Sequence, residues 1–376
     1  MTQEATGRRP LTGVKVVETS SYVTGPYAGL QLADLGADVL KIEAKDGDPF
    51  RRFNHQKNKL SATWASINRD KRHIYLNLKD PVDRDRALDE IAVADVLISN
   101  WRPHVADKLG LGRETVRKRN PKIINLAISG FGLSGEMADK PTYDSLIQAR
   151  TGICHYGQPE GEPYLPPFWI VDKVVGIQAS QAILAALYER EVTGEGSDID
   201  LAMLDATAYF NMSDMMQTRV FEGDTAKARR TPSTMFETSN GHILICPVNG
   251  KQMVRTLEAV GHPEWKAEIT NINHPVERTE AFYRYVGEAV KTRTSEEWLK
   301  IFDEFDVPAG PVWTIDEHLA DPQVETNEIY SMIGDEGDRM RAVRFPAIFN
   351  GRKLKPQRAV PRIEPIENNT SKGEKP

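Results

Sequence analysis

The sequence predicts an α/β protein with a parallel sheet, chiefly because strand-like and helix-like segments alternate through its first 130 residues. Apolar strand-like segments occur at residues 13–20, 37–43, 73–79, 94–100 and 122–131. Helical segments are expected at residues 26–36, 81–93 and 106–119. Strands separated by helices of this length pair in parallel, with helices covering the faces of the sheet.

The pattern changes after about residue 220, where a smaller α+β domain is expected to begin. Asn240-Gly241 lies between two short strand-like segments, which is a strong hairpin signal. Helical stretches follow at residues 277–292 and 295–305, and then a short helix and a last strand around residues 342–350. We predict a large domain of residues 1–220 and 320–376 and a small domain of residues 221–319.

Composition limits the kinds of partner. The chain has 376 residues and a net charge of -6, which argues against a general nucleic-acid binder. Its two cysteines, Cys154 and Cys246, have no metal-ligand spacing, so neither a zinc site nor a disulfide framework is expected. The N-terminus lacks an apolar signal core, and we see no apolar run approaching the length of a membrane span. We expect a cytoplasmic protein with no membrane partner.

Asp172 is the main catalytic candidate. It follows an apolar loop, residues 166–169, and stands at the start of a helix rich in small residues. Aspartate is a preferred N-cap because it accepts hydrogen bonds from unpaired backbone N–H groups, so one interpretation is purely structural. The other is a nucleophile held in a dry pocket. Spacing alone leaves both open.

Polar loops follow the predicted strands at residues 20–25, 43–48, 100–103 and 129–135, where ligands of parallel sheets bind. Gly130, Gly132 and Gly135 spell GxGxxG, which raises the alternative of an NAD-dependent oxidoreductase. That fingerprint belongs after the first strand and opens an amphipathic helix, whereas residues 136–141 (EMADKP) show no helical apolar stripe. We interpret these glycines as a flexible loop over a ligand.

Several segments, in order, resemble the class III coenzyme A-transferase family, also called the carnitine dehydratase/formyl-CoA transferase family. They include LTGVKVVETSSYVTGPYAGLQLADLGADVLKIE, GDPFR, NRDKRHIYLNLKDP, ADVLISNWRP, YDSLIQARTGI, the Asp172 stretch and VPAGPV. The resemblance covers roughly residues 10–350. It implies a Rossmann-like large domain, a small α+β domain and a homodimer of two interlocked chains. It also implies a CoA transferase that takes acyl-CoA and a small carboxylic acid as substrates, with no permanently bound cofactor.

The resemblance assigns the family's nucleophilic aspartate to Asp172. It assigns coenzyme A contacts to Val23, Thr24, Leu76, Asn77, Leu78, Lys79, Asn100, Trp101, Arg102, Lys108 and Lys140. The cations among them suit the phosphates of coenzyme A. Where the family often has an arginine after the second strand, this chain has Ala44, and Lys45 or Arg51 is the alternative cation.

Tyr143 and Asp144 bear on the choice of reaction and are also expected at the coenzyme A site. Racemases of the same family, which epimerise 2-methylacyl-CoA esters, have a His-Asp pair at this position. A phenol exchanges protons poorly at neutral pH compared with imidazole, so Tyr143 favours transfer over racemisation. His55 and His104 remain alternative bases for a racemase.

The expected mechanism is covalent catalysis by Asp172, which attacks the thioester to give a mixed anhydride and then an aspartyl-CoA thioester. We take Asp172 to be an ordinary carboxylate, ionised at neutral pH, so the attack needs no metal. Backbone N–H groups at a helix start or in the glycine loop are the expected oxyanion donors. Residues 166–169 and 130–135 are the expected walls that exclude water.

Overall fold

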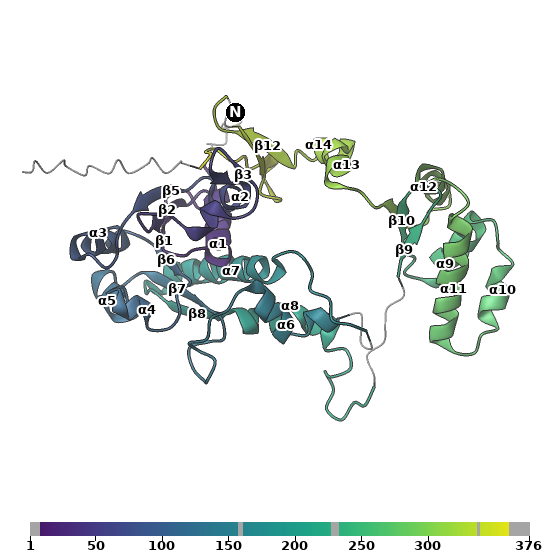
Figure 1. Ribbon diagram of the computed structural model, residues 1–376, viewed down its shortest axis with the longest axis horizontal. Helices are drawn as coiled ribbons and strands as arrows, with labels where there is room; N and C mark the ends of the chain where they lie inside the picture. Colours follow the sequence, from purple (N-terminus) through teal and green to yellow (C-terminus); the bar gives the residue numbers. More distant parts are fainter. Residues whose placement is uncertain (1–7, 157–160, 227–232, 337–338, 361–376) are drawn as a thin grey trace, which may run out of the picture. The chain divides into compact units, whose positions relative to one another are not determined.

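The computed structural model describes residues 8–156, 161–226, 233–336 and 339–360. The chain forms two compact units (Figure 1). The large unit comprises Met1–Tyr156, Glu160–Ala226 and Glu328–Pro376, and the small unit comprises Gly157–Pro159 and Lys227–Asn327. Each unit has its own hydrophobic core.

A six-stranded sheet of parallel neighbours forms the centre of the large unit. Its strands are β1 (Lys15–Glu18), β2 (Asp38–Glu43), β5 (Arg72–Tyr75), β6 (Val96–Ser99), β7 (Ile124–Ser129) and β8 (Asp198–Ala202). The spatial order β5-β2-β1-β6-β7-β8 is 3-2-1-4-5-6 in chain order, the order of doubly wound dinucleotide-binding folds. The prediction of an α/β fold with a parallel sheet is confirmed.

The edge strand β8 was not predicted. Its sequence, DIDLA, alternates polar and apolar residues because Asp198 and Asp200 point away from the core. These carboxylates pair with Arg117 (2.7 Å) and with Arg113. The interior strands β6 and β7 are almost wholly buried and show the continuous apolar runs typical of parallel sheets.

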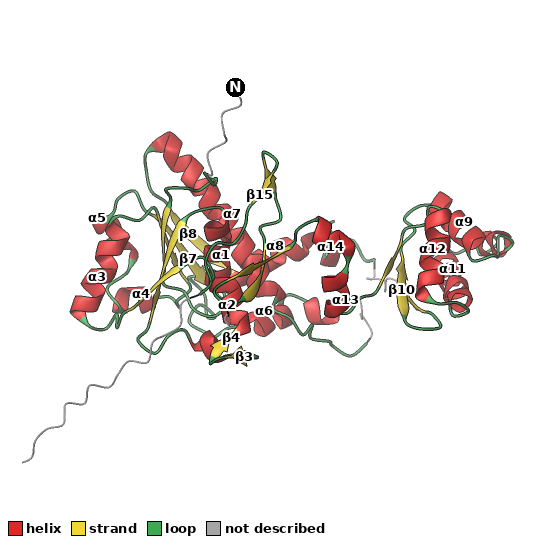
Figure 2. Cartoon of the chain, turned by 90° about the horizontal axis from the view of Figure 1, so that it is seen from above, coloured by secondary structure: helices red, strands yellow, loops and turns green. Residues whose placement is uncertain are grey.

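Helices cover both faces of the sheet (Figure 2). One face packs against α1 (Thr24–Asp34) and α7 (Ile170–Thr193), and its core includes Leu32, Ile98 and Val175. The other face packs against α3 (Pro81–Ala92) and α5 (Arg113–Arg119), and its core includes Leu97 and Ile91. Alternate residues of β6 therefore serve opposite cores, as the two-residue period of a strand requires.

The predicted helix over residues 106–119 is wrong, because two helices occupy that stretch. They are α4 (Val105–Lys108) and α5, separated by residues 109–112. Gly110 has φ +71°, a left-handed conformation that glycine adopts without steric cost, and Gly112 is the extended N-cap of α5. The apolar residues in LGLG continue the helical pattern, whereas the glycines between them end it.

Among the described residues, α7 is the one helix long and apolar enough to cross a membrane by length and composition, which the sequence inspection overlooked. Its Val175, Ala179 and Ile183 are fully buried in the core beside the sheet. The core helix of a soluble protein passes the same test of length and composition, so this finding is weak support for a membrane span.

The small unit has a three-stranded antiparallel sheet in the order β11-β10-β9. The predicted hairpin at Asn240-Gly241 is confirmed, since it joins β9 (Met235–Glu237) to β10 (His242–Ile245). The other elements of this unit are β11 (Ala309–Pro311), α9 (Gly250–Ala259), α10 (Trp265–Thr270), α11 (Pro275–Val290), α12 (Ser295–Glu304), α13 (Ile315–Ala320) and α14 (Pro322–Thr326).

Short elements complete the large unit. They are η1 (Pro49–Arg52), β3 (Gln56–Lys57), β4 (Leu60–Ser61), α2 (Ala62–Asn68), α6 (Asp144–Arg150), η2 (Ile153–His155), α8 (Met203–Met215), β12 (Tyr330–Ile333), β13 (Met340–Val343), β14 (Ile348–Phe349) and β15 (Arg352–Lys353). The single last strand expected around residues 342–350 is thus wrong, because two small antiparallel pairs, β12–β13 and β14–β15, occupy this region.

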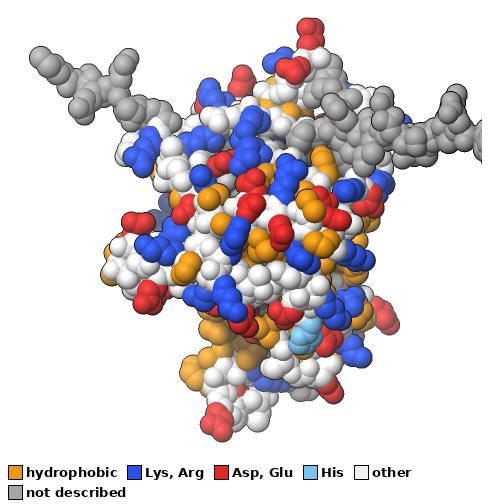
Figure 3. Space-filling model, turned by 90° about the vertical axis from the view of Figure 1, so that its left-hand side faces the viewer, with side chains coloured by type: hydrophobic (Ala, Val, Ile, Leu, Met, Phe, Trp, Pro, Cys, Tyr) orange, Lys and Arg blue, Asp and Glu red, His pale blue; other side chains and the backbone are white. Residues whose placement is uncertain are grey.

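One face of the protein carries Lys and Arg side chains interspersed with Asp and Glu (Figure 3), and charges of mixed sign partly cancel in the field that a polyanion would experience there.

A fully buried ion network lies at the carboxyl end of β1. Glu18 pairs with Lys41 Nζ at 2.7 Å and with Lys71 Nζ at 2.8 Å. Lys41 also donates to the backbone carbonyl of Ser20 (2.7 Å) and lies 3.4 Å from Asp48. Burial alone would raise the pKa of Glu18, but the two lysines outweigh it and lower that pKa to about 2. Glu18 therefore stays charged inside the fold.

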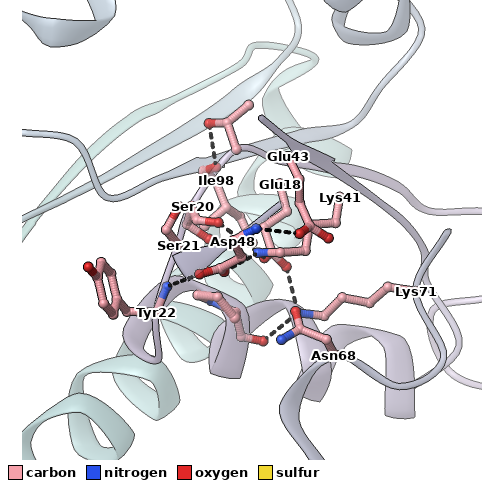
Figure 4. Close-up of polar contacts among 12 residues, drawn as sticks. Glu18, Ser20, Ser21, Tyr22, Lys41, Glu43, Asp48, Asn68, Lys71 and Ile98 are labelled. Carbon is pink, nitrogen blue, oxygen red and sulfur yellow. Dashed lines mark hydrogen bonds and ion pairs between the residues drawn. The ribbon is translucent and has the colours of Figure 1, made fainter. Parts of the chain in front are cut away.

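Asp48 connects this network to the loop that follows β1 (Figure 4). Its Oδ1 accepts hydrogen bonds from the backbone N–H groups of Tyr22 (3.2 Å) and Phe50 (2.9 Å). Tyr22 has φ 63°, a left-handed conformation that is strained for a residue with a bulky side chain. The network thus fixes the course of residues 20–23, which lead into α1.

We expect Lys41→Met to destabilise the protein by about 3–5 kcal/mol, because the change leaves Glu18 and Asp48 buried with one cation fewer. Arg72→Met is the matched control, since the Arg72–Asp38 ion pair is about half-exposed and such pairs contribute about 0–1 kcal/mol. Urea unfolding of both variants measures the difference. Equal, small losses would show that the network does not hold the fold.

Candidate active site

A cavity of about 380 Å³ lies beyond the carboxyl ends of β1, β6 and β7. β1 and β6 are adjacent in the sheet and mark the point where the strand order reverses, which is where doubly wound folds bind their ligands. Asp172, from the first turn of α7, lines this cavity. So do six other residues predicted for the site: Thr24, Asn100, Trp101, Arg102, Lys140 and Tyr143.

Asp172 does not cap its helix, so the N-cap interpretation is wrong. The N-cap of α7 is Trp169, and Asp172 is the third helical residue. The backbone N–H of Asp172 donates instead to Asp144 Oδ2 at 3.0 Å. Asp144, the buried first residue of α6, thus supplies the acceptor that the start of α7 needs. The carboxylate of Asp172 is left for other contacts.

The side chain of Asp172 is held by Thr24, whose hydroxyl donates a hydrogen bond to Asp172 Oδ1. Thr24 is the first residue of α1 and is buried. α1 and α7 approach closely here because residue 176 is glycine: a Cβ at that position would lie 2.9 Å from the backbone oxygen of Thr24. Gly176 is one helical turn after Asp172, so the same close approach brings the carboxylate to the hydroxyl.

The pKa of Asp172 is raised from 3.8 to about 6, chiefly by burial and in smaller part by the neighbouring Asp144 carboxylate. The Thr24 hydrogen bond acts in the opposite direction and limits the increase. The assumption of an ordinary carboxylate is therefore wrong. Asp172 is still mostly ionised at pH 7, and its higher basicity makes it a stronger nucleophile than an exposed aspartate.

The loop after β1 is joined to the loop after β6 by a pair of hydrogen bonds. Asn100 Oδ1 accepts from the backbone N–H of Ser21 (3.0 Å), and its Nδ2 donates to the carbonyl of Ser21 (2.7 Å). Tyr22 packs edge-on against Tyr143, with ring centroids 5.6 Å apart. These contacts bring the β1 and β6 loops and the start of α6 together around the cavity.

A second cavity, of about 450 Å³, lies beyond the ends of β2 and β5. Its lining includes the predicted residues Leu76, Asn77, Leu78 and Lys79. Ser21 and Trp101 line both cavities, so the two adjoin. An extended ligand could run from one into the other past Trp101.

The two cations expected in place of the arginine missing at Ala44 differ in their surroundings. Lys45 lines the second cavity and lies 3.3 Å from Asp83. Arg51 is buried, pairs with Glu43 at 2.7 Å and stacks on Trp64 at 3.5 Å from the ring centroid. Of the two alternatives, Lys45 is the one beside the cavity.

Three predicted residues line neither cavity. Val23 is buried as the N-cap of α1, in a core with Phe50 and Trp64. Lys108 is exposed at the end of α4. Asp144 lies behind Asp172, as described above.

The glycine loop lines the cavity through Gly130, the first of its glycines. Gly132 and Gly135 have positive φ, and the next helix, α6, begins only at Asp144, so no helix opens at the GxGxxG motif. The dinucleotide interpretation lacks its structural context. Of the two expected walls, Gly130 contributes and residues 166–169 are not among the lining residues. Trp169 packs instead on Phe50, at 5.5 Å between centroids.

Sequence reasoning missed other lining residues, among them Ser21, Tyr22, Thr142 and Met203. The Thr142 hydroxyl is buried and has no hydrogen-bond partner among the described residues. A Cβ at position 130 would collide with the Thr142 side chain at 2.1 Å, so glycine lets the two ends of the β7–α6 connection meet. Ser21 and Tyr22 belong to residues 20–25, one of the loops predicted to bind a ligand, whereas no sequence pattern points to Thr142 or Met203.

Comparison with known proteins defines the class. The chain matches CoA-transferase family III over residues 11–365 and belongs to that family, so it is an enzyme of the class III CoA-transferases. It is 30% identical to the succinate–glutarate CoA-transferase of Agrobacterium fabrum, over 96% of this chain and 95% of the relative. It is 31% identical to the acetyl-CoA:oxalate CoA-transferase of Acetobacter aceti, over 86% and 85% of the two chains.

Solved structures agree with this assignment. A CAIB/BAIF family protein from Brucella suis superposes with a TM-score of 0.83 at 28% identity, covering 94% of this chain and 96% of that one. Rv3272 from Mycobacterium tuberculosis superposes with a TM-score of 0.79 at 26% identity, covering 93% and 97%. The predicted family is confirmed.

We expect Asp172→Asn to stabilise the protein at pH 7–8. The folded-state pKa of about 6 exceeds the ordinary 3.8, so the wild type loses stability as pH rises from about 4 to 6. The shift corresponds to about 3 kcal/mol at most, and asparagine removes it while keeping an oxygen for Thr24. Urea midpoints measured from pH 3.5 to 8 should diverge with rising pH and converge below pH 4. A variant that is less stable than the wild type at pH 8 would contradict the burial argument.

Proposed function

We propose that the protein transfers coenzyme A from an acyl-CoA to a small carboxylic acid through a covalent intermediate on Asp172. The observation that carries the proposal is the placement of a partly buried carboxylate, with a pKa raised to about 6, in the cavity at the switch point of the sheet. No hydrolase-type histidine contacts Asp172 in the described part of the chain; its side-chain partner there is Thr24. The reactive group is therefore the carboxylate itself.

The chemistry proceeds by exchange of acyl bonds. Asp172 Oδ2 attacks the thioester carbonyl, the C–S bond breaks, and a mixed anhydride and the CoA thiolate form. The thiolate then attacks Asp172 Cγ, the Cγ–Oδ2 bond breaks, and the donor acid leaves with that oxygen. An aspartyl-CoA thioester remains. An acceptor carboxylate attacks Cγ and the two steps run in reverse, giving the new acyl-CoA and restoring the carboxylate.

The cations beside the two cavities support coenzyme A as the ligand. Lys140 and Arg102 line the first cavity, and Lys79 and Lys45 line the second. We place the phosphates near these side chains and the thioester at Asp172, with the connecting arm beside Trp101. Relatives named for succinate, glutarate, acetyl-CoA and oxalate make short mono- and dicarboxylic acids the first compounds to screen.

Racemisation of a 2-methylacyl-CoA is the alternative within the family. Tyr143 lines the cavity and packs against Tyr22, at the position where the family resemblance puts a histidine in racemases. A phenol there favours transfer, because enolisation needs a base that accepts a proton near neutral pH.

The test is a mass measurement of the whole protein after mixing with an acyl-CoA. We expect wild type to gain the mass of CoA less one water, and a peptide containing Asp172 to give a hydroxamate with hydroxylamine. Asp172→Asn should form no adduct and lose several orders of magnitude in turnover, because the attacking oxygen anion is gone while side-chain size is kept.

Two outcomes would contradict the proposal. One is near-normal transfer by Asp172→Asn. The other is rapid exchange of the α-hydrogen of a 2-methylacyl-CoA in deuterated water without an acceptor acid, which would point to the racemase.

We also propose that the protein is a cytoplasmic homodimer of interlocked chains, as the family resemblance implies. Both cysteines, Cys154 and Cys246, are free thiols, which suits a reducing compartment. Helices α7 and α8 of the single chain expose large apolar side chains, including Ile177, Tyr188 and Tyr209. Monomeric proteins rarely leave clustered apolar surface uncovered, so a second chain is the proposed cover.

Light scattering at low micromolar concentration should therefore give twice the chain mass of 42.2 kDa. Because interlocked chains separate only by unfolding, dilution to nanomolar concentration should give no active monomer. A stable and fully active monomer would refute the interlocked dimer without affecting the assignment of Asp172.

A further inference from the structure

The two oxygens of Asp172 differ in their contacts. Oδ1 accepts the hydrogen bond of the Thr24 hydroxyl, whereas Oδ2 has no hydrogen-bond partner among the described residues. Asp172 lines the cavity, so Oδ2 is the oxygen available to a bound thioester. The contact with Thr24 therefore makes the two oxygens different: Oδ2 is the oxygen that can attack, and Oδ1 is the oxygen that stays on Cγ.

The Thr24 hydroxyl is held in place by the backbone around it. Thr24 begins α1 directly after the loop that the Glu18–Lys41 network fixes, and it is buried. On its other side, α7 approaches to van der Waals contact at Gly176. A donor fixed from two sides needs no reorganisation when charge develops next to it, which is the condition for effective electrostatic catalysis.

We propose that Thr24 is a catalytic residue whose hydroxyl stabilises the oxyanion that forms on Asp172 Oδ1 each time Cγ is attacked. The inference rests on the proposed function. When the thiolate adds to Cγ of the anhydride, the Cγ–Oδ1 double bond opens and a full negative charge develops on Oδ1. The donor acid then leaves with Oδ2, and the Oδ1 carbonyl re-forms. The acceptor acid adds to the aspartyl-CoA thioester through the same oxyanion.

The energetic gain comes from the difference between states. In the anhydride and in the thioester, Oδ1 is a neutral carbonyl oxygen and its hydrogen bond is weak. In the tetrahedral species, Oδ1 carries the charge, and hydrogen bonds to charged oxygens are roughly twice as strong. An interaction that strengthens only in the transition state accelerates the step. The resemblance assigned Thr24 to coenzyme A, but a hydroxyl has one proton to donate and this one is directed at Asp172.

Two substitutions at this position separate the hydroxyl from its packing. Thr24→Val replaces the hydroxyl with a methyl of similar size, and Thr24→Ser keeps the hydroxyl. Stopped mixing of each variant with acyl-CoA gives the rate at which the aspartyl-CoA adduct appears, and a second mixing with acceptor acid gives the rate at which it is consumed. We expect both rates to fall about 100-fold or more in Thr24→Val and to stay within about threefold of wild type in Thr24→Ser, the range seen when one oxyanion donor is removed.

A pH profile provides a readout that altered packing alone would not move. The groups that act on the pKa of the carboxylate are Thr24 of α1 through a hydrogen bond and, through their charges, Asp144 of α6 and the exposed Lys173 of α7. Since the Thr24 hydrogen bond lowers the pKa of Asp172, the acidic limb of the rate profile should shift upward in Thr24→Val and not in Thr24→Ser.

The outcomes separate the two proposals. If wild type forms no adduct at Asp172, the proposed function fails. If wild type forms the adduct and Thr24→Val matches its rates, or if Thr24→Ser is as slow as Thr24→Val, the role of Thr24 is refuted while the covalent mechanism stands.

Discussion

The buried ion pair between Glu18 and the two lysines, Lys41 and Lys71, is the constraint on which the site depends. A charge in a strand interior is tolerated only when it is paired and hydrogen-bonded. The pairing that satisfies Glu18 also extends to the carbonyl of Ser20 and to Asp48, and Asp48 holds the backbone of Tyr22. These ion pairs and hydrogen bonds thus set the course of the loop after β1. That loop in turn determines where α1 begins and where the Thr24 hydroxyl lies.

From Thr24 onward, packing rather than charge determines how the helices around Asp172 are positioned. Gly176 lets α7 lie against the start of α1, and Asp144 holds the first turn of α7 through the N–H of Asp172. Two elements around Asp172 therefore hold different atoms of it: α1 holds Oδ1 and α6 holds the backbone nitrogen, whereas Oδ2 has no hydrogen-bond partner among the described residues. In the proposed mechanism, this leaves Oδ2 to attack a thioester without a separate base to activate it.

The parallel sheet and most of its helices follow from local pattern, because buried strands are continuous apolar runs and helices carry their own start and stop residues. β8 is not recognised because two of its five residues are aspartates, and α4 and α5 are merged because the apolar residues beside Gly110 and Gly112 continue the helical pattern that the glycines end. The site is harder to predict from the sequence than the fold. Glu18 and Lys41 are charged residues within predicted strands and Lys71 immediately precedes β5, and only tertiary structure pairs them. Spacing alone leaves the N-cap open for Asp172, because Asp144, which accepts its backbone N–H, lies 28 residues away in the chain.

Two carboxylates of the same unit, one fully buried and one partly buried, illustrate how environment changes a pKa. Glu18, between two lysines, has its pKa lowered to about 2 and serves as a permanent structural charge. Asp172, with a hydroxyl and a second carboxylate as neighbours, has its pKa raised to about 6. Divergent pKa values of this kind separate structural from reactive acids. The desolvation that raises the pKa of Asp172 lowers the stability of the fold, whereas the charge of Glu18 is paired with its lysines and holds the loop that leads to Thr24, the side-chain partner of Asp172.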